Sequence, residues 1–186
     1  MKTKYITIAI LIIAVISGCA YQQVAMKKDY DFTKIKRVAV VGFAGYSGFR
    51  NSGDVVADEF IMQLLNKGMS VIERSRIDVL MRERQIRQMD SETAKDIGKI
   101  LGVDVVITGS VVKYVEDNKS IIYNTDKDGR TTSQITMSEA RTEIYARMID
   151  VQSGEIVWTS RNHDVALDIA DAVSYTVSGL LSTLKW

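Results

Sequence analysis

Between residues 36 and 115, short β-branched runs alternate with amphipathic stretches, and this order limits the fold more than any other feature of the sequence. The runs suit buried strands, whereas the stretches carry apolar side chains at helical spacing. Strands that are linked by helices tend to pair in parallel, so the order predicts an α/β fold. The predicted strands are residues 36–43, 69–74 and 103–115, and the predicted helices are residues 54–67, 76–88 and 92–101.

The C-terminal part of the sequence replaces this alternation with a hairpin and one helix. Ile144, Ala146 and Met148 alternate with polar side chains, as in a strand with one covered face. A QSG turn at 152–154 leads into a further strand, which must run antiparallel to the first. Residues 166–184 place their apolar side chains on one helical face. We therefore predict a single α/β domain, with a mixed β-sheet flanked by helices and a long C-terminal helix.

The N-terminus has the pattern of an export signal. Two lysines precede an apolar run at residues 5–16, which is shorter than the roughly 20 residues that a membrane-spanning helix needs. Small residues end the run, and the sequence ISGC resembles a bacterial lipobox, in which the chain is cut between Gly18 and Cys19. The Cys19 thiol would then carry a diacyl group and its new amine a further acyl chain such as palmitate. The alternative is an incidental thiol beside an ordinary signal peptide.

These features divide the chain into three predicted parts. Residues 1–18 are a lipoprotein signal peptide, residues 19–33 a lipidated N-terminus and tether, and residues 34–186 the folded domain. Two or three acyl chains hold a membrane stably, whereas one does so only marginally. In such lipoproteins an Asp after the Cys commonly marks inner-membrane retention, and here Ala20 follows. The expected location is the periplasmic face of the outer membrane, with the covalent lipid as the only cofactor.

Charge and residue content argue against several functions. Removing residues 1–18 takes away two of the 24 basic residues, which leaves 22 against 23 acidic residues and no field that would gather nucleic acid. The glycines at 42, 45 and 48 match no nucleotide-binding motif, and a loop that needs unusual backbone angles explains them better. His163 is the only histidine, and Cys19 is committed to lipid. We expect no nucleotide, no metal and no enzymatic activity.

Two groups of residues are candidates for contacts with a ring neighbour or another partner. Tyr46 and Phe49 lie in the glycine-rich loop and could form an aromatic collar or anchor a neighbouring domain. Arginines gather on the second predicted helix, where they form either a solvated face or a contact surface, since Arg is favoured at interfaces. These arginines include Arg74, Arg76, Arg82 and Arg84.

Three segments, taken in order, resemble the CsgG family of curli assembly and transport lipoproteins. They are VIERSRIDVLMRERQI, AKDIGKILGVDVVITGSVVKY and ARMIDVQSGEIVW. The resemblance spans about residues 36–186, and the lipobox agrees with it. It implies an α/β periplasmic domain similar to LpoB and to the N-terminal domain of TolB, together with a tendency to form rings.

The family's secretion channels also carry membrane β-hairpins, and here the sequence departs from the pattern. The first hairpin would occupy residues 113–140, but a charge at the bilayer midplane costs about 2–4 kcal/mol, so Asp117 and Lys119 oppose insertion. A water-exposed hairpin that turns at residues 128–129 is predicted instead. The second hairpin has no room between residues 158 and 166.

The resemblance favours a non-enzymatic outer-membrane lipoprotein of the CsgG type. It would support assembly or export of a curli-like surface or envelope structure, as a homo-oligomer or with an envelope protein partner. The alternative is a lipid-anchored binding module resembling LpoB, which would regulate a peptidoglycan synthase. The short tether opposes a long reach, because residues 20–33 extend no more than roughly 50 Å at about 3.5 Å per residue.

Overall fold

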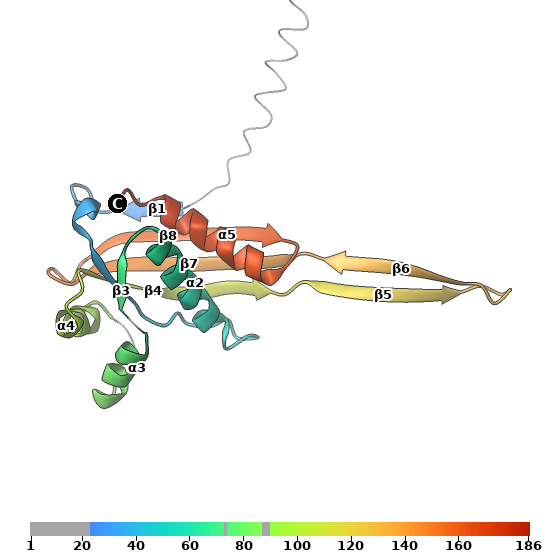
Figure 1. Cartoon of the computed structure of the whole chain (residues 1–186), viewed down its shortest axis with the longest axis horizontal. Coiled ribbons are helices and arrows are strands. Elements are labelled where there is room, and N and C mark those ends of the chain that lie inside the picture. Colours follow the sequence, from blue (N-terminus) through green and yellow to red (C-terminus); the bar gives the residue numbers. More distant parts are fainter. Residues whose placement is uncertain (1–22, 73, 87–89) are drawn as a thin grey trace, which may run out of the picture.

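A computed structural model describes residues 23–72, 74–86 and 90–186, and it confirms a single α/β domain. Its main sheet has six strands in the order β1-β8-β7-β4-β2-β3, and strands β5 and β6 form a separate two-stranded sheet (Figure 1). Strand β2 pairs in parallel with β3 and β4, whereas β7 pairs antiparallel with β4 and β8. The expected combination of early parallel and late antiparallel pairing is confirmed.

The elements have the following bounds. They are β1 Gln23–Met26, η1 Phe32–Lys34, β2 Arg37–Val40, α2 Ser52–Asn66, β3 Ser70–Ile72, α3 Arg74–Glu83, α4 Ser91–Leu101, β4 Val105–Val115, β5 Asn118–Thr125, β6 Thr131–Ser138, β7 Ala140–Asp150, β8 Ile156–Ala166 and α5 Ile169–Ser182.

Helices cover the two faces of the main sheet unequally. Helices α2 and α5 pack on one face and enclose the larger core, in which Phe60, Trp158 and Leu180 are fully buried. Helices α3 and α4 pack on β2, β4 and part of β7 on the other face, around Ile77 and Ile97. Among the described helices, none combines the length and apolar character needed to cross a membrane.

Capping explains where the later helices begin and end. Asp90 accepts a hydrogen bond from the Thr93 backbone N–H at 2.8 Å, and Gly102 ends α4 with φ 65°. Helix α5 begins at Ile169 rather than at Ala166, because the Asp168 carboxylate caps it by accepting from the Asp171 N–H at 2.8 Å. Ala166 instead ends strand β8.

The prediction that residues 20–33 form a tether outside the fold is wrong from residue 23 onward. Strand β1 pairs antiparallel with β8, from Gln23 opposite Arg161 to Met26 opposite Trp158. All four of its residues are exposed, so backbone pairing rather than an apolar pattern makes the strand. Residue 23, four positions after Cys19, is therefore already part of the fold, and Cys19 itself lies outside the described residues.

Candidate functional site

A long hairpin, which we call the arm, projects from one end of the body (Figure 1). It consists of β5 and β6, which continue the directions of β4 and β7 and pair only with each other within the described chain. Eight residues per strand give the arm a length of about 26 Å at roughly 3.3 Å per residue. Residues 126–130 form its tip, where Gly129 has φ 80°. The predicted exposed hairpin with a turn at residues 128–129 is confirmed.

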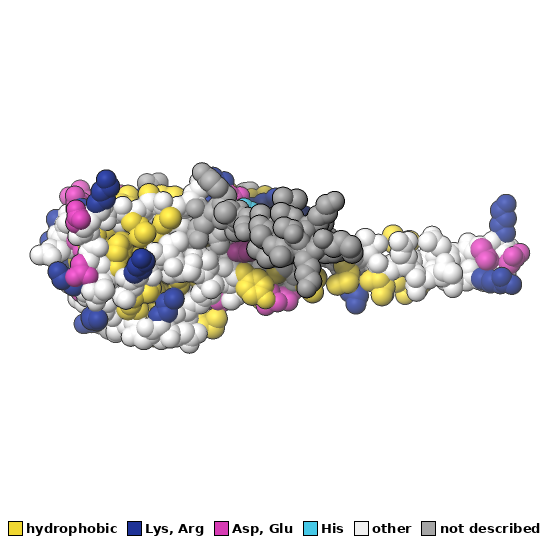
Figure 2. Space-filling model, turned by 90° about the horizontal axis from the view of Figure 1, so that it is seen from above, with side chains coloured by type: hydrophobic (Ala, Val, Ile, Leu, Met, Phe, Trp, Pro, Cys, Tyr) yellow, Lys and Arg dark blue, Asp and Glu magenta, His cyan; other side chains and the backbone are white. Residues whose placement is uncertain are grey.

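One face of the arm carries an apolar row. Ile121 lies opposite Ile135 in the pairing register, and Tyr123 and Met137 flank them on the same face. These four side chains are 48 to 68% exposed. Polar side chains dominate the opposite face of this hairpin, where Ile122 is the large apolar residue. Figure 2 shows yellow apolar side chains on the arm near the body and charged side chains at its tip.

The arm is poorly supported by its own chain. A two-stranded hairpin is only marginally stable in water, and every residue of β5 and β6 is exposed. Its outer edges also present backbone N–H and C=O groups that can pair with another strand. An apolar row on such an element is typical of a surface that contacts another molecule.

The glycine-rich loop lies at the base of the arm. The Phe49 ring contacts the ring of Tyr114 near the end of β4, with centroids 5.4 Å apart. Tyr46 is half-buried against the core, and its N–H donates to the Ser52 hydroxyl at 2.9 Å. Burial, reinforced by Glu116, raises the pKa of Tyr114. The two predicted contact aromatics are thus brought together, and Phe49 remains 38% exposed.

The expected reason for the loop glycines is wrong. The described glycines with positive φ are at positions 68, 102, 129 and 154, outside this loop. Gly45 and Gly53 are instead required by close approach, since an added Cβ would lie 2.4 Å from the Arg50 carbonyl oxygen and 2.1 Å from the Phe43 carbonyl oxygen. The loop is therefore folded tightly onto its own chain.

The arginine candidates lie elsewhere. They belong to α3 and the turn after it, on the face of the sheet opposite α2 and α5. Arg82 and Arg84 are exposed, whereas the side chains of Arg74 and Arg76 lie outside the described part of the structure. The structure does not bring these arginines together with Tyr46 and Phe49, so they would belong to a separate contact. Gly18 and Cys19 also lie outside the described residues.

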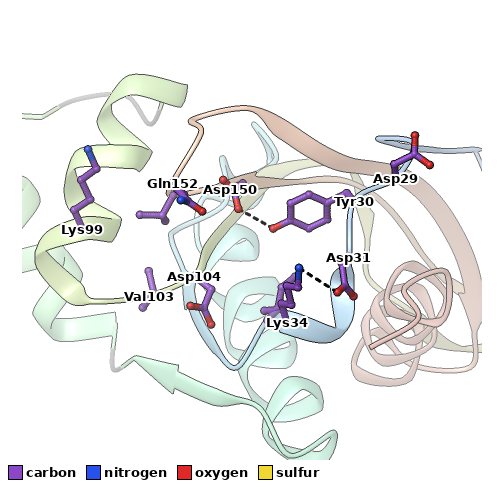
Figure 3. A pocket seen from close by; sticks show the side chains of 11 residues that line it. Asp29, Tyr30, Asp31, Lys34, Lys99, Val103, Asp104, Asp150 and Gln152 are labelled. Atoms are coloured by element: carbon purple, nitrogen blue, oxygen red, sulfur yellow. Dashed lines mark hydrogen bonds and ion pairs between the residues drawn. The ribbon is translucent and has the colours of Figure 1, made fainter.

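A cleft of about 640 Å³ lies at the opposite end of the body (Figure 3). The segment before β2, the end of α4 and the β7–β8 turn enclose it. Its carboxylates have structural partners: Asp104 accepts from the Lys36 and Arg37 backbone N–H groups at 2.7 and 2.8 Å. Asp31 accepts from the Thr33 N–H at 3.1 Å. Hydrogen bonds at the cleft therefore hold the N-terminal segment against the sheet, a role that the sequence pattern did not indicate.

Asp150 makes the central hydrogen bonds that hold this segment. It accepts from the Ser153 N–H at 2.7 Å and from the Tyr30 hydroxyl at 2.8 Å. Partial burial alone would raise the pKa of Asp150, but these hydrogen bonds outweigh it and lower the pKa. Burial is the main cause that raises the pKa of Tyr30, and the hydrogen bond to Asp150 adds to it.

Asp150→Asn should destabilise the fold at neutral pH by about 1 kcal/mol, because the carboxylate is only partly buried. A carboxyl group with a lowered folded-state pKa stabilises the fold above its unfolded pKa, and this contribution disappears as the pH falls through the folded value. The variant should thus lose part of the acid sensitivity seen below about pH 4. Urea unfolding between pH 3 and 7 checks this, with exposed Asp29→Asn as the control; parallel stability profiles for wild type and variant would contradict it.

Catalytic groups are sparse in the described structure. Within residues 23–72, 74–86 and 90–186, no group of three or more His, Cys, Asp and Glu side chains could hold a metal ion. His163 lies exposed within β8. Beside it, Asp164 has its pKa raised by burial, with His163 opposing that shift.

Comparison with protein families gives one match. The family described as "Curli production assembly/transport component CsgG" matches residues 21–176. This span includes the sheet, the arm and most of α5. No curated protein matches the sequence.

Solved structures with a TM-score above 0.5 share the fold at low sequence identity. PelC from Paraburkholderia phytofirmans, whose structure is described as a dodecamer, has a TM-score of 0.56 and 16% identity over 87% of this chain and 94% of that chain. Lipoprotein GNA1162 from Neisseria meningitidis has a TM-score of 0.52 and 16% identity over 80% of this chain and 94% of that chain. The LpoB C-terminal domain from Escherichia coli has a TM-score of 0.47 and 12% identity over 74% of this chain and 88% of that chain.

Proposed function

The chain belongs to the CsgG family, and on that premise we propose that it is a non-enzymatic outer-membrane lipoprotein that works as a homo-oligomer in the assembly or export of a curli-like surface or envelope structure. Lipid on Cys19 would anchor it to the periplasmic face of the membrane. The family match supports the coarser statement that this is a CsgG-like envelope protein.

The observation that carries the proposal is the arm. Its apolar row, built on Ile121 and Ile135, is exposed on a hairpin that no other described element covers. In the oligomer, the neighbouring copies would cover this row and pair with its free edges. Burying apolar area of this kind is the usual main contribution to stable association.

The fold relative PelC adds support, since its solved structure is described as a dodecamer. Identical copies arranged side by side around an axis would place their arms next to one another. The base of each arm would then present Phe49 at an equivalent height in every copy. A ring of this kind could guide or gate a polymer that leaves the cell.

The native mass and single-particle shape of the full-length lipoprotein, extracted gently in detergent, test this proposal. We expect a closed ring in which the arms lie side by side. A monomer or dimer that persists across concentration would overturn the oligomeric function. That result would instead favour a lipid-anchored binding module that resembles LpoB, to be tested by pull-down with a peptidoglycan synthase.

A further inference from the structure

The two faces of the main sheet carry opposite charge. Helices α2 and α5 cover one face, and neither contains a Lys or Arg between its bounds. Acidic residues occupy the first half of α2 and the start of α5. They are Asp54, Asp58, Glu59, Asp171 and the N-cap residue Asp168.

The opposite face is basic, as the pairing register shows. Ile144 and Ala146 of β7 point into the core under α5, so the residues between and beside them point to the other side. Lys113 pairs opposite Glu143, and Arg161 opposite Tyr145, on this second face. Arg141 and Arg147 follow at the same two-residue spacing along β7. These four cations share the face with the carboxylate of Glu143, which forms an ion pair with Arg161.

Much of this basic face is left uncovered by the described helices. Helices α3 and α4 pack on β2, β4 and the end of β7 nearest the cleft. Beyond them, Val115, Tyr145 and Val165 are 36 to 45% exposed. A hollow of about 560 Å³ lies here, lined by residues of β1, β7 and β8 that include Tyr145 and Arg161. We call this surface, from Lys113 to Arg161, the open sheet face.

The outer surface of helices α2 and α5 also exposes large apolar side chains. Val55, Met62 and Leu65 of α2 and Tyr175 of α5 are 43 to 56% exposed. The two helices lie side by side, since the Gln63 amide donates to the Ser174 carbonyl at 3.0 Å. Acidic and apolar side chains thus share one broad surface, which we call the α2–α5 layer.

We propose that the open sheet face of one copy docks on the α2–α5 layer of the next copy. Charge identifies a second copy of the chain as the occupant, because one chain carries both a basic and an acidic surface with apolar side chains among the charges. Contact between two different faces is heterologous, and such contacts generate rings when the rotation closes. The proposal rests on the homo-oligomer proposed above and identifies the surfaces that would build it.

The position of the charges also fixes how the copies align. Lys113 and Arg141 lie at the end of the sheet nearest the arm. Helix α5 begins at the same end, where Asp117, just before the arm, accepts from the Ile169 N–H at 3.2 Å. Docking of the basic cluster on the acidic cluster therefore keeps neighbouring arms pointing in the same direction.

Paired charge reversals in the full-length lipoprotein test the contact. We expect Lys113→Glu with Arg141→Glu, and separately Glu59→Lys with Asp171→Lys, each to weaken the oligomer at least tenfold. The four changes combined in one chain should restore it, because every interface then again joins opposite charges. Lys36→Glu with Lys99→Glu, at the cleft end, is the matched control. Wild-type oligomers should also dissociate more readily in 1 M salt, where the screening length is about 3 Å.

Cross-linking gives a second readout that does not depend on the stability of the charge variants. Chains with Lys113→Cys and chains with Asp171→Cys are co-expressed, both with Cys19 lipidated, and treated with a short bismaleimide. We expect cross-links between the two kinds of chain and almost none in either variant alone.

The outcomes separate this contact from the proposed function. If the wild type is a ring but neither reversal changes its mass, or Lys113→Cys chains cross-link to one another, this interface is overturned while the oligomer stands. If the wild type is monomeric in detergent, both the oligomer and this contact are overturned.

Discussion

Cys19→Ala should abolish lipidation and remove nearly all of the protein from the outer-membrane fraction. The lipobox predicts that lipid is attached at this thiol, and each buried CH₂ of an acyl chain contributes about 0.8 kcal/mol of membrane affinity. Loss of two or three chains thus removes the whole predicted anchor. Fractionation and mass spectrometry of the mature N-terminus check the result.

Ala20→Asp is the matched control for this variant. It leaves Cys19 available for lipid but introduces the residue that commonly marks inner-membrane retention in such lipoproteins. We expect a protein that is still lipidated and has moved to the inner membrane. If Cys19→Ala leaves processing and membrane association unchanged, the lipoprotein assignment is wrong.

The local pattern of the sequence was sufficient for most elements of the fold. Strand β2 and helix α4 were predicted because each depends on neighbouring residues, a β-branched run for the strand and apolar side chains at helical spacing for the helix. The hairpin was placed by the family resemblance, and its polar side chains then indicated that it is exposed. Strand β1 was missed because its four residues owe their structure to backbone pairing with a strand more than 130 residues away.

The surfaces that carry the proposals were harder to predict. The sequence indicated Tyr46 and Phe49, but the contact of Phe49 with Tyr114 depends on the parallel pairing of β2 with β4. The basic face was also hidden, because Lys113, Arg141 and Arg161 come from three strands and meet only through the register. Charge counted along the chain is nearly balanced, whereas its separation between two faces exists only in three dimensions.

Ile121→Thr with Ile135→Thr should dissociate the oligomer and abolish its function without unfolding the body. Thr keeps the β-branched shape that suits a strand, and the arm lies apart from both cores. Each change removes about 1.5 kcal/mol of apolar burial if the row is covered by a neighbour. The pair would weaken each contact by about 3 kcal/mol, which is about 100-fold.

Ile122→Thr is the control that separates the apolar row from general damage to the hairpin. Ile122 is next to Ile121 in β5 and equally exposed, at 48%, but it points to the polar face. Native mass in detergent and thermal melting of the body should both remain near wild type for this variant. If the Ile121 and Ile135 changes act no more strongly than Ile122→Thr, the apolar row is not buried between copies. A buried interface is sensitive to changes on the face of the arm that it covers and much less to a change on the other face. Equal effects would therefore mean that the arm extends into solvent as a separate binding element.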